Sequence, residues 1–194
     1  MNDPPAGAVP GAGSGSVPAG TVGTLALPTP SGTTTKQNVI DNFDLAILRE
    51  LQRDNQTPQR LIAEAVGLSA PAVQRRIRKL EDSGAIQANV AVIDPLKVGQ
   101  HITLLVAVEM ESEHSEMLDA AKASFAAAPE VQQCYYVTGE ADFMLIIVVP
   151  SMADYELLTK RLFFANNNVK RFRTSVAMDR VKVGLSVPIG MTGP

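Results

Sequence analysis

Residues 57–84 read TPQRLIAEAVGLSAPAVQRRIRKLEDSG and contain the start and stop signals of two short helices. Thr57 is a good helix cap, and the proline that follows it is favoured as the first helical residue. Gly67 can adopt the left-handed conformation that ends a helix, and Ser69 caps the next one. Two short helices joined by a tight turn that contains glycine are typical of a helix-turn-helix motif.

The second of these helices combines a buried stripe with a basic surface. Val73, Ile77 and Leu80 recur at spacings of four and three, which places them on one face. Between residues 69 and 80 the helix carries no acid and four cations, which are Arg75, Arg76, Arg78 and Lys79. Such a charge run is usually just a solvated face. Its place on the second helix, after a turn of the right length, favours a helix that enters the DNA major groove.

The candidate DNA-binding residues fall into two groups. Gln74, Arg75 and the small residues of the first turn lie where base edges are reached, whereas the later cations are better placed for phosphates. The full set is Ser69, Ala70, Pro71, Ala72, Gln74, Arg75, Arg76, Arg78 and Lys79.

A third amphipathic helix precedes this pair and supplies the core that two helices lack. Asp41 is its expected cap, and its apolar stripe is Phe43, Ile47, Leu48 and Leu51. After the last helix, residues 86–90 can form a short wing strand, so we predict a winged helix-turn-helix domain over residues 39–92. Residues 41–88 are neutral, with seven basic and seven acidic residues. We therefore expect modest affinity per reading head and two or more heads per complex.

Composition argues against several other classes of protein. Residues 1–38 hold six prolines and seven glycines and are expected to be disordered, without the features of a secretory signal. No apolar run approaches the ~20 residues of a membrane helix. The single Cys134 fits a strand position and a reducing, cytoplasmic compartment. With only His101 and His114 and no converging catalytic groups, we expect no metal, no cofactor and no enzymatic activity.

After an expected linker at residues 93–99, the pattern changes to strands and helices over residues 100–188. The strand at 102–108 is expected to be buried on both faces or nearly so. A capping box at Ser151 to Asp154 predicts the start of the second helix. The order strand, helix, strand, strand, helix, strand is that of the ferredoxin-like fold (βαββαβ), so the fold class is α+β. The expected segments are 102–108, 117–128, 131–138, 142–149, a helix around 155–163, a strand at 171–178 and a further strand at 181–187, with a tail at 189–194.

A sheet of this type covers one face with its two helices and leaves the other face open. A soluble protein avoids a large exposed apolar patch, so the open face is expected to pair with a second copy. We therefore expect a homodimer through the C-terminal half of the chain.

The ordered set of motifs resembles the Lrp/AsnC regulators. The resemblance rests on residues 44–52, 61–69 and 73–81, on Gly84-Ala-Ile86, on the linking run AVIDPLKVG at 91–99, and on Thr138-Gly-Glu-Ala-Asp-Phe143. It covers about residues 41–188 and implies control of transcription tuned by an amino acid or a related small molecule. It also implies double-stranded DNA as a partner, dimers that often build octamers, and an effector-sensing C-terminal domain. The implied effector residues are Tyr136, Thr138, Gly139, Glu140, Ala141 and Asp142.

Two positions depart from the family pattern. Gln56-Thr57 replaces the usual Gly-Arg, and Ala88-Asn89 replaces the usual Gly-Tyr of the wing. The second departure removes a flexible residue and a tyrosine, which weakens the case for wing contacts to DNA. For the effector turn, an alternative is that Gly139 and Asp142 serve only the backbone geometry of a hairpin.

Two further classes of function stay open beside the regulator. One is a nucleoid-associated, DNA-architectural protein without an effector, and the other is an enzyme subunit that reuses a small-molecule-binding domain. A small molecule that changes DNA affinity or assembly separates the regulator from the architectural protein.

Overall fold

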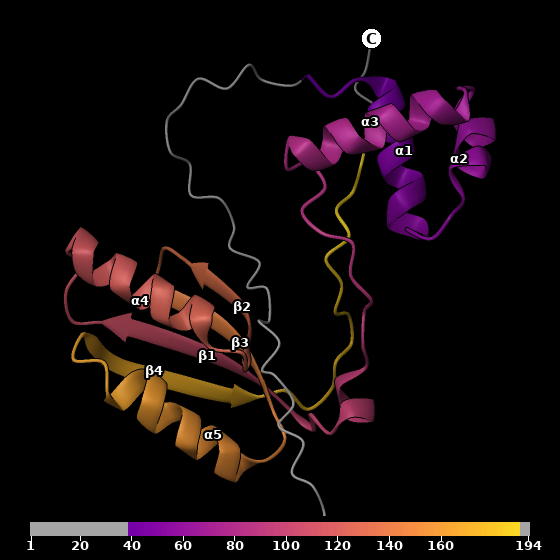
Figure 1. Ribbon diagram of the computed structural model, residues 1–194. Helices are drawn as coiled ribbons and strands as arrows, with labels where there is room; N and C mark the ends of the chain where they lie inside the picture. Colours follow the sequence, from indigo (N-terminus) through magenta and orange to yellow (C-terminus); the bar gives the residue numbers. More distant parts are fainter. Residues whose placement is uncertain (1–38, 191–194) are drawn as a thin grey trace, which may run out of the picture.

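The computed structural model describes residues 39–190 (Figure 1). The tail expected to be disordered, residues 1–38, lies outside the described residues, as do residues 191–194. Three helices come first: α1 (Asn42–Arg53), α2 (Gln59–Val66) and α3 (Ala70–Asp82).

The helix boundaries follow from their caps. Asp41 caps α1 and forms a reciprocal capping box with Asp44, as each side chain accepts the other's backbone N–H. Gly67 ends α2 in the left-handed conformation with φ 70°, and the Ser69 hydroxyl caps α3. The prediction that Thr57 caps α2 was wrong by one residue: Pro58 is the cap residue, with no side-chain hydrogen bond.

The three helices enclose a small apolar core of Ile47, Ile62, Ala63, Val73 and Leu80. Leu48, Leu51 and Ile77 are half-buried against it. Phe43 was expected in this stripe, but it is 45% exposed and its ring lies against the guanidinium of Arg76. Phe43 therefore has a cation for a neighbour instead of the apolar core.

The predicted wing strand at residues 86–90 is absent: residues 87–94 are irregular. Ile86 still reaches the core of the helical domain. The connection then forms a short 3₁₀ turn, η1 (Pro95–Val98), which Asp94 caps and Gly99 ends. A strand needs a neighbouring strand to satisfy its backbone, and none of the described strands pairs with this segment.

The second half is the predicted ferredoxin-like domain. Its strands are β1 (Ile102–Met110), β2 (Val131–Tyr136), β3 (Phe143–Val149) and β4 (Val169–Val176). They form one antiparallel sheet in the order β2-β3-β1-β4. The helices are α4 (Ser115–Ala127) and α5 (Met152–Thr159), and α5 continues into a π-helical turn, η2 (Lys160–Phe164).

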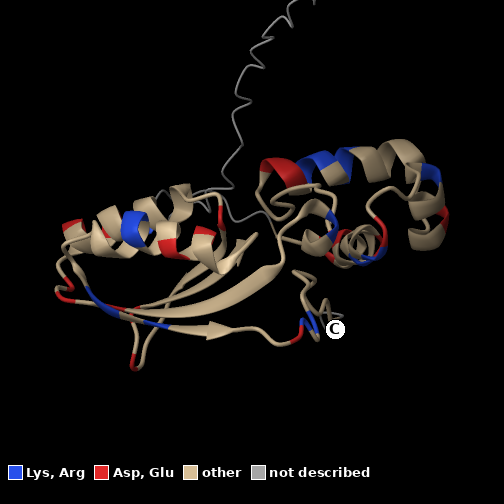
Figure 2. Ribbon diagram, turned by 90° about the horizontal axis from the view of Figure 1, so that it is seen from below, with Lys and Arg blue, Asp and Glu red and all other residues tan. Residues whose placement is uncertain are grey.

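Both helices lie on one face of this sheet (Figures 1 and 2). Alternate residues of β1 and β3 face them and are buried, with Phe125, Phe143 and Phe163 stacked edge to face between the layers. Strand β1 was expected to be buried on both faces or nearly so; on the face away from the helices its residues are at most half-buried, and Leu105 is 39% exposed. Tyr135 is exposed too, because no described element covers all of this open face.

The chain from Ala177 to Gly190 has no regular secondary structure and does not form the strand predicted at residues 181–187. Val181, Val183, Leu185 and Val187 do alternate as in a strand, yet all four are exposed. No described strand lies beside them to complete a ladder. None of the helices in residues 39–190 is long and apolar enough to span a membrane.

Candidate DNA interface and effector turn

Helix α3 presents most of the predicted DNA-binding side chains to solvent. Pro71, Gln74, Arg75, Arg78 and Lys79 are exposed, as is the capping Ser69. Ala70 and Ala72 are half-buried, and Ala70 packs against the small core. Figure 2 shows basic residues along α3 and acidic ones at its C-terminal end. The helix therefore offers one polar, cationic surface opposite the stripe that Val73 and Leu80 bury.

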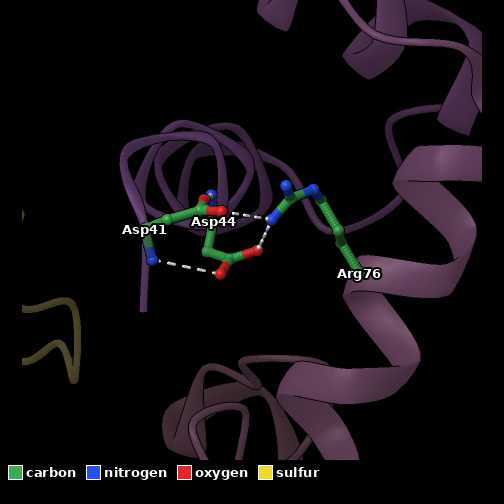
Figure 3. Close-up of polar contacts among 3 residues, drawn as sticks. All are labelled: Asp41, Asp44 and Arg76. Atoms are coloured by element: carbon green, nitrogen blue, oxygen red, sulfur yellow. Dashed lines mark hydrogen bonds and ion pairs between the residues drawn. The ribbon is translucent and has the colours of Figure 1, made fainter. Parts of the chain in front are cut away.

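Arg76 has a different environment from its neighbours. Its Nη1 donates to Oδ2 of Asp41 at 2.8 Å and to Oδ1 of Asp44 at 2.7 Å (Figure 3). The Asp44 side chain is 2% exposed, and that of Arg76 is 24% exposed. These contacts tie the middle of α3 to the first turn of α1. We call the three residues the α1–α3 ion-pair cluster.

Contacts within this cluster shift the pKa values of Asp41 and Arg76 toward their charged forms. Burial raises the pKa of the Asp41 carboxyl, but hydrogen bonds from the backbone of Asp44 and from Arg76 outweigh that effect, so its pKa lies below the ordinary value. The pKa of Arg76 is raised, first by its hydrogen bond to Asp44. The guanidinium is thus held as a structural cation, which is distinct from a side chain free to reach a phosphate.

The predicted effector turn closes the β2–β3 hairpin. Gly139 has φ 126°, which a residue with a side chain rarely adopts. Asp142 is bound to the neighbouring strand: its Oδ2 accepts the N–H of Met110 at 2.7 Å, and its own N–H donates to Val108 at 2.9 Å. These bonds lie next to the register shift of β1 at Glu109/Met110. Asp142 therefore has a structural role at the end of β1, as the alternative explanation of this turn requires.

Charged side chains from other elements lie near this turn as well. Glu140 lies 3.4 Å from Arg173 of β4, and the ammonium of Lys122 on α4 lies 5.2 Å from the ring centre of Tyr136. Thr138, Glu140 and Tyr136 are exposed, while Ala141 and Asp142 are half-buried. No sequence motif marks Lys122 or Arg173, because α4 and β4 meet the turn only in the folded sheet.

Among the described residues, no group of three or more metal-ligating side chains converges. Burial raises the pKa of the Cys134 thiol to about 11, which makes it a poor nucleophile at neutral pH.

The paired aromatic residues of the effector domain differ in burial. Phe163 is buried, whereas Phe164 is exposed and packs on Phe172. The neighbouring residues Tyr135 and Tyr136 are both exposed, so neither belongs to the buried core, although the ring of Tyr136 contacts the ring of Phe143.

The fold and these surfaces define a class: a helix-turn-helix DNA-binding protein with a separate α+β domain of ligand-sensing type. Two family models match the chain, the AsnC-type helix-turn-helix domain over residues 40–81 and the Lrp/AsnC ligand binding domain over residues 103–187. The chain belongs to the Lrp/AsnC family of transcriptional regulators.

Named relatives agree with this assignment. The HTH-type transcriptional regulator y4tD of Sinorhizobium fredii is 41% identical over 150 residues, which is 77% of this chain and 89% of the relative. The leucine-responsive regulatory protein of Rhizobium meliloti is 33% identical over 77% of this chain and 96% of its own length. The solved structure of the feast or famine regulatory protein from M. tuberculosis, complexed with L-methionine, superposes with a TM-score of 0.70. It is 31% identical and covers 78% of this chain and 100% of that one.

Proposed function

We propose that this regulator binds operator DNA through paired α3 helices and that an amino acid bound at the β2–β3 turn modulates the binding. The observation that carries the proposal is the exposed cationic face of α3 in a chain whose second domain belongs to a ligand-binding family. The expected organisation is a DNA-binding domain at residues 39–92, a linker at 93–99 and an effector domain at 100–188.

For DNA binding, we assign base contacts to Gln74 and Arg75 and phosphate contacts to Arg78 and Lys79. Arg76 supports α3 from behind through the α1–α3 ion-pair cluster. Arg75→Ala should weaken specific binding by about 1–3 kcal/mol and relax one operator position. Lys79→Ala should weaken specific and random DNA alike and lower the salt slope by about one.

The DNA test measures affinity by fluorescence anisotropy on a selected operator and on random duplex, at several salt concentrations. Lys160→Ala is the matched control, because Lys160 is an exposed cation in the other domain, paired with Glu156. Equal losses on both duplexes for Arg75→Ala would contradict the division of roles.

For assembly, we propose a homodimer through the open face of the sheet, with larger assemblies such as octamers built from it. Leu105 and Tyr135 are large apolar side chains exposed on that face. Leu105→Arg should therefore yield monomers in analytical ultracentrifugation. Leu157→Arg is the control, because Leu157 is 65% exposed on α5, on the other side of the domain. A dimeric Leu105→Arg variant would place the interface elsewhere.

For the effector, an amino acid needs donors for its carboxylate and an acceptor for its ammonium group. Val137 and Asp142 already donate their N–H groups within the domain, whereas in the described structure no hydrogen bond uses those of residues 138–141. Those N–H groups, with Lys122, can hold a carboxylate, and Glu140 with Asp142 can hold an ammonium. The methionine bound by the M. tuberculosis relative makes L-methionine a suitable first probe.

The effector test is calorimetric titration of L-methionine and L-leucine into wild type, Asp142→Asn and the control Asp82→Asn, which removes an exposed carboxylate at the end of α3 in the other domain. The asparagine amide oxygen at 142 can still accept from Met110, so it keeps the structural bond and removes the charge. A large loss of affinity for Asp142→Asn alone supports an ammonium site. Gly139→Leu is unsuitable, because φ 126° strains any side chain there while nothing lies within 4 Å to be crowded.

The second candidate, an effector-independent architectural protein, gains support from the structural role of Asp142. DNA affinity that no amino acid changes would favour it. We propose no enzymatic activity, since no nucleophile, acid and base converge among the residues described. We also propose a cytoplasmic, nucleoid-associated location, because that is where a DNA-binding regulator acts.

A further inference from the structure

The C-terminal segment, residues 177–190, connects the effector domain to the reading head. It leaves the sheet at Ala177, whose N–H donates to Thr103 at 2.9 Å. It then borders a hollow of about 370 Å³ on the open face, between the sheet and its own residues Arg180 and Lys182. In Figure 1 it continues from the end of β4 to α1.

At α1 the segment is bound through its backbone. The side-chain amide of Gln52 donates to the carbonyl of Val187 at 3.0 Å and accepts the N–H of the same residue at 2.8 Å. A neighbouring β-strand satisfies a residue in the same two-way manner. The guanidinium of Arg49 donates to the carbonyls of Ile189 at 3.2 Å and Gly190 at 3.3 Å.

The two α1 side chains are three positions apart, so they lie on one face of the helix. All four bonds go to backbone atoms of three residues within a four-residue stretch. Pro188, between the two anchors, fixes its own φ and lowers the entropy lost when the segment is ordered. Ile189 is the residue of this stretch whose side chain is half-buried, whereas Val187 is exposed.

We propose that this face of α1, through Arg49 and Gln52, is a docking surface for the backbone of the chain's own residues 187–190. Helix α1 is also the helix that Asp41 and Asp44 bind to Arg76 of α3. Docking therefore fixes the recognition helix relative to the effector domain through one intermediate helix. A change at the sheet can reach α3 by loosening or tightening this segment, and that consequence rests on the proposed effector response.

The first test measures docking by amide hydrogen exchange on the full chain, in the absence of DNA and effector. Gln52→Leu removes the donor and the acceptor, so exchange at Val187 should accelerate about tenfold, the equivalent of one to two hydrogen bonds. Arg53→Ala is the control on the next position of α1, where the exposed side chain pairs with Glu50. Unchanged exchange at Val187 in Gln52→Leu would overturn the proposal.

A second test decides whether the docked segment belongs to the same chain. Arg53→Cys, one position after Gln52 and outside the docking pair, and Val187→Cys, whose docking bonds are made by the backbone, are combined with Cys134→Ser and treated with a short bismaleimide. A cross-linked monomer on a denaturing gel supports docking within one chain. A covalent dimer would show that the segment docks on a partner copy, and failure to cross-link two reactive thiols would refute docking; both outcomes overturn the proposal as stated.

The third test concerns the consequence for regulation. In Gln52→Leu, the ratio of the DNA affinities measured with and without L-methionine should fall severalfold below the ratio for wild type. If wild type itself does not respond to any amino acid, the proposed effector function fails, but the exchange result still decides docking. A full response in Gln52→Leu would overturn the coupling role.

Discussion

The two domains differ most in how much apolar surface each buries. The helical head has a core of five buried apolar residues, none aromatic, whereas the effector domain has sixteen, including three phenylalanines. A domain of about fifty residues buries a smaller fraction of its surface than a larger one and is correspondingly marginal. The head supplements its core with the α1–α3 ion-pair cluster and with the C-terminal segment on α1. The comparison indicates that polar contacts help to position the recognition helix in a domain whose apolar core is small.

The largest expected effect tests the apolar side of this comparison. Phe125→Ala removes a fully buried ring that contacts Phe143 and Phe163. It should lower the stability of the effector domain by about 3–5 kcal/mol, from lost transfer energy and the cavity left behind. Thermal unfolding followed by circular dichroism measures it. A loss below about 1 kcal/mol would show that the aromatic core is not the main source of the stability of the effector domain.

The next effect tests the polar side. Arg76→Gln leaves Asp44 buried without its cation, so the head should lose about 2–4 kcal/mol, somewhat less than for a fully buried pair because Asp41 is half exposed. Arg78→Gln, on the exposed side of α3, should stay within about 0.5 kcal/mol of wild type. Urea unfolding of both variants gives the comparison, and equal stabilities would contradict a positioning role for Arg76.

The same variant carries a pH signature. The folded-state pKa of Asp41 is lowered, so its contribution is complete above its ordinary value of 3.8 and is lost as pH falls through the lowered value. The stability gap between wild type and Arg76→Gln should therefore be constant from about pH 7 to 5 and shrink toward pH 3. A gap that widens on acidification would rule out the carboxylate contribution.

A smaller effect sharpens the contrast within the effector domain. Asp142→Ala removes the acceptor of the Met110 N–H and should cost about 1–3 kcal/mol of domain stability, while Asp142→Asn should recover most of it. Chemical denaturation of the two variants reads the structural role independently of any ligand. If alanine and asparagine destabilise equally, the bond to Met110 contributes little.

The smallest effect concerns Cys134, which is half-buried on β2 with a pKa raised to about 11 by burial. In the folded protein, iodoacetamide at pH 8 should modify it slowly, and much faster in urea. Modification as fast as that of a free thiol would mean that the β2 edge opens readily.

The helix-turn-helix, the ferredoxin-like order and the family could all be predicted from the sequence, because periodic apolar residues and caps act over a few positions. Three of the failures share one cause. Residues 86–90 and 181–187 have strand-like sequences, but they lack a partner strand in the described structure. Phe43 fits an apolar stripe by spacing, but its neighbour is Arg76. In each case a non-local neighbour determines the outcome, and local spacing contains no information about it.

The candidate sites divide in the same way. By itself the sequence determined which helix carries the cations, which turn closes the hairpin and which stripe of α3 is buried, since these follow from 3.6-residue and two-residue periodicity. Only the tertiary structure decided that Arg76 faces α1, that Asp142 binds the end of β1, and that Gln52 receives Val187. Those contacts join residues 32 to 135 positions apart, and a directional hydrogen bond forms between them only when the whole fold brings donor and acceptor together.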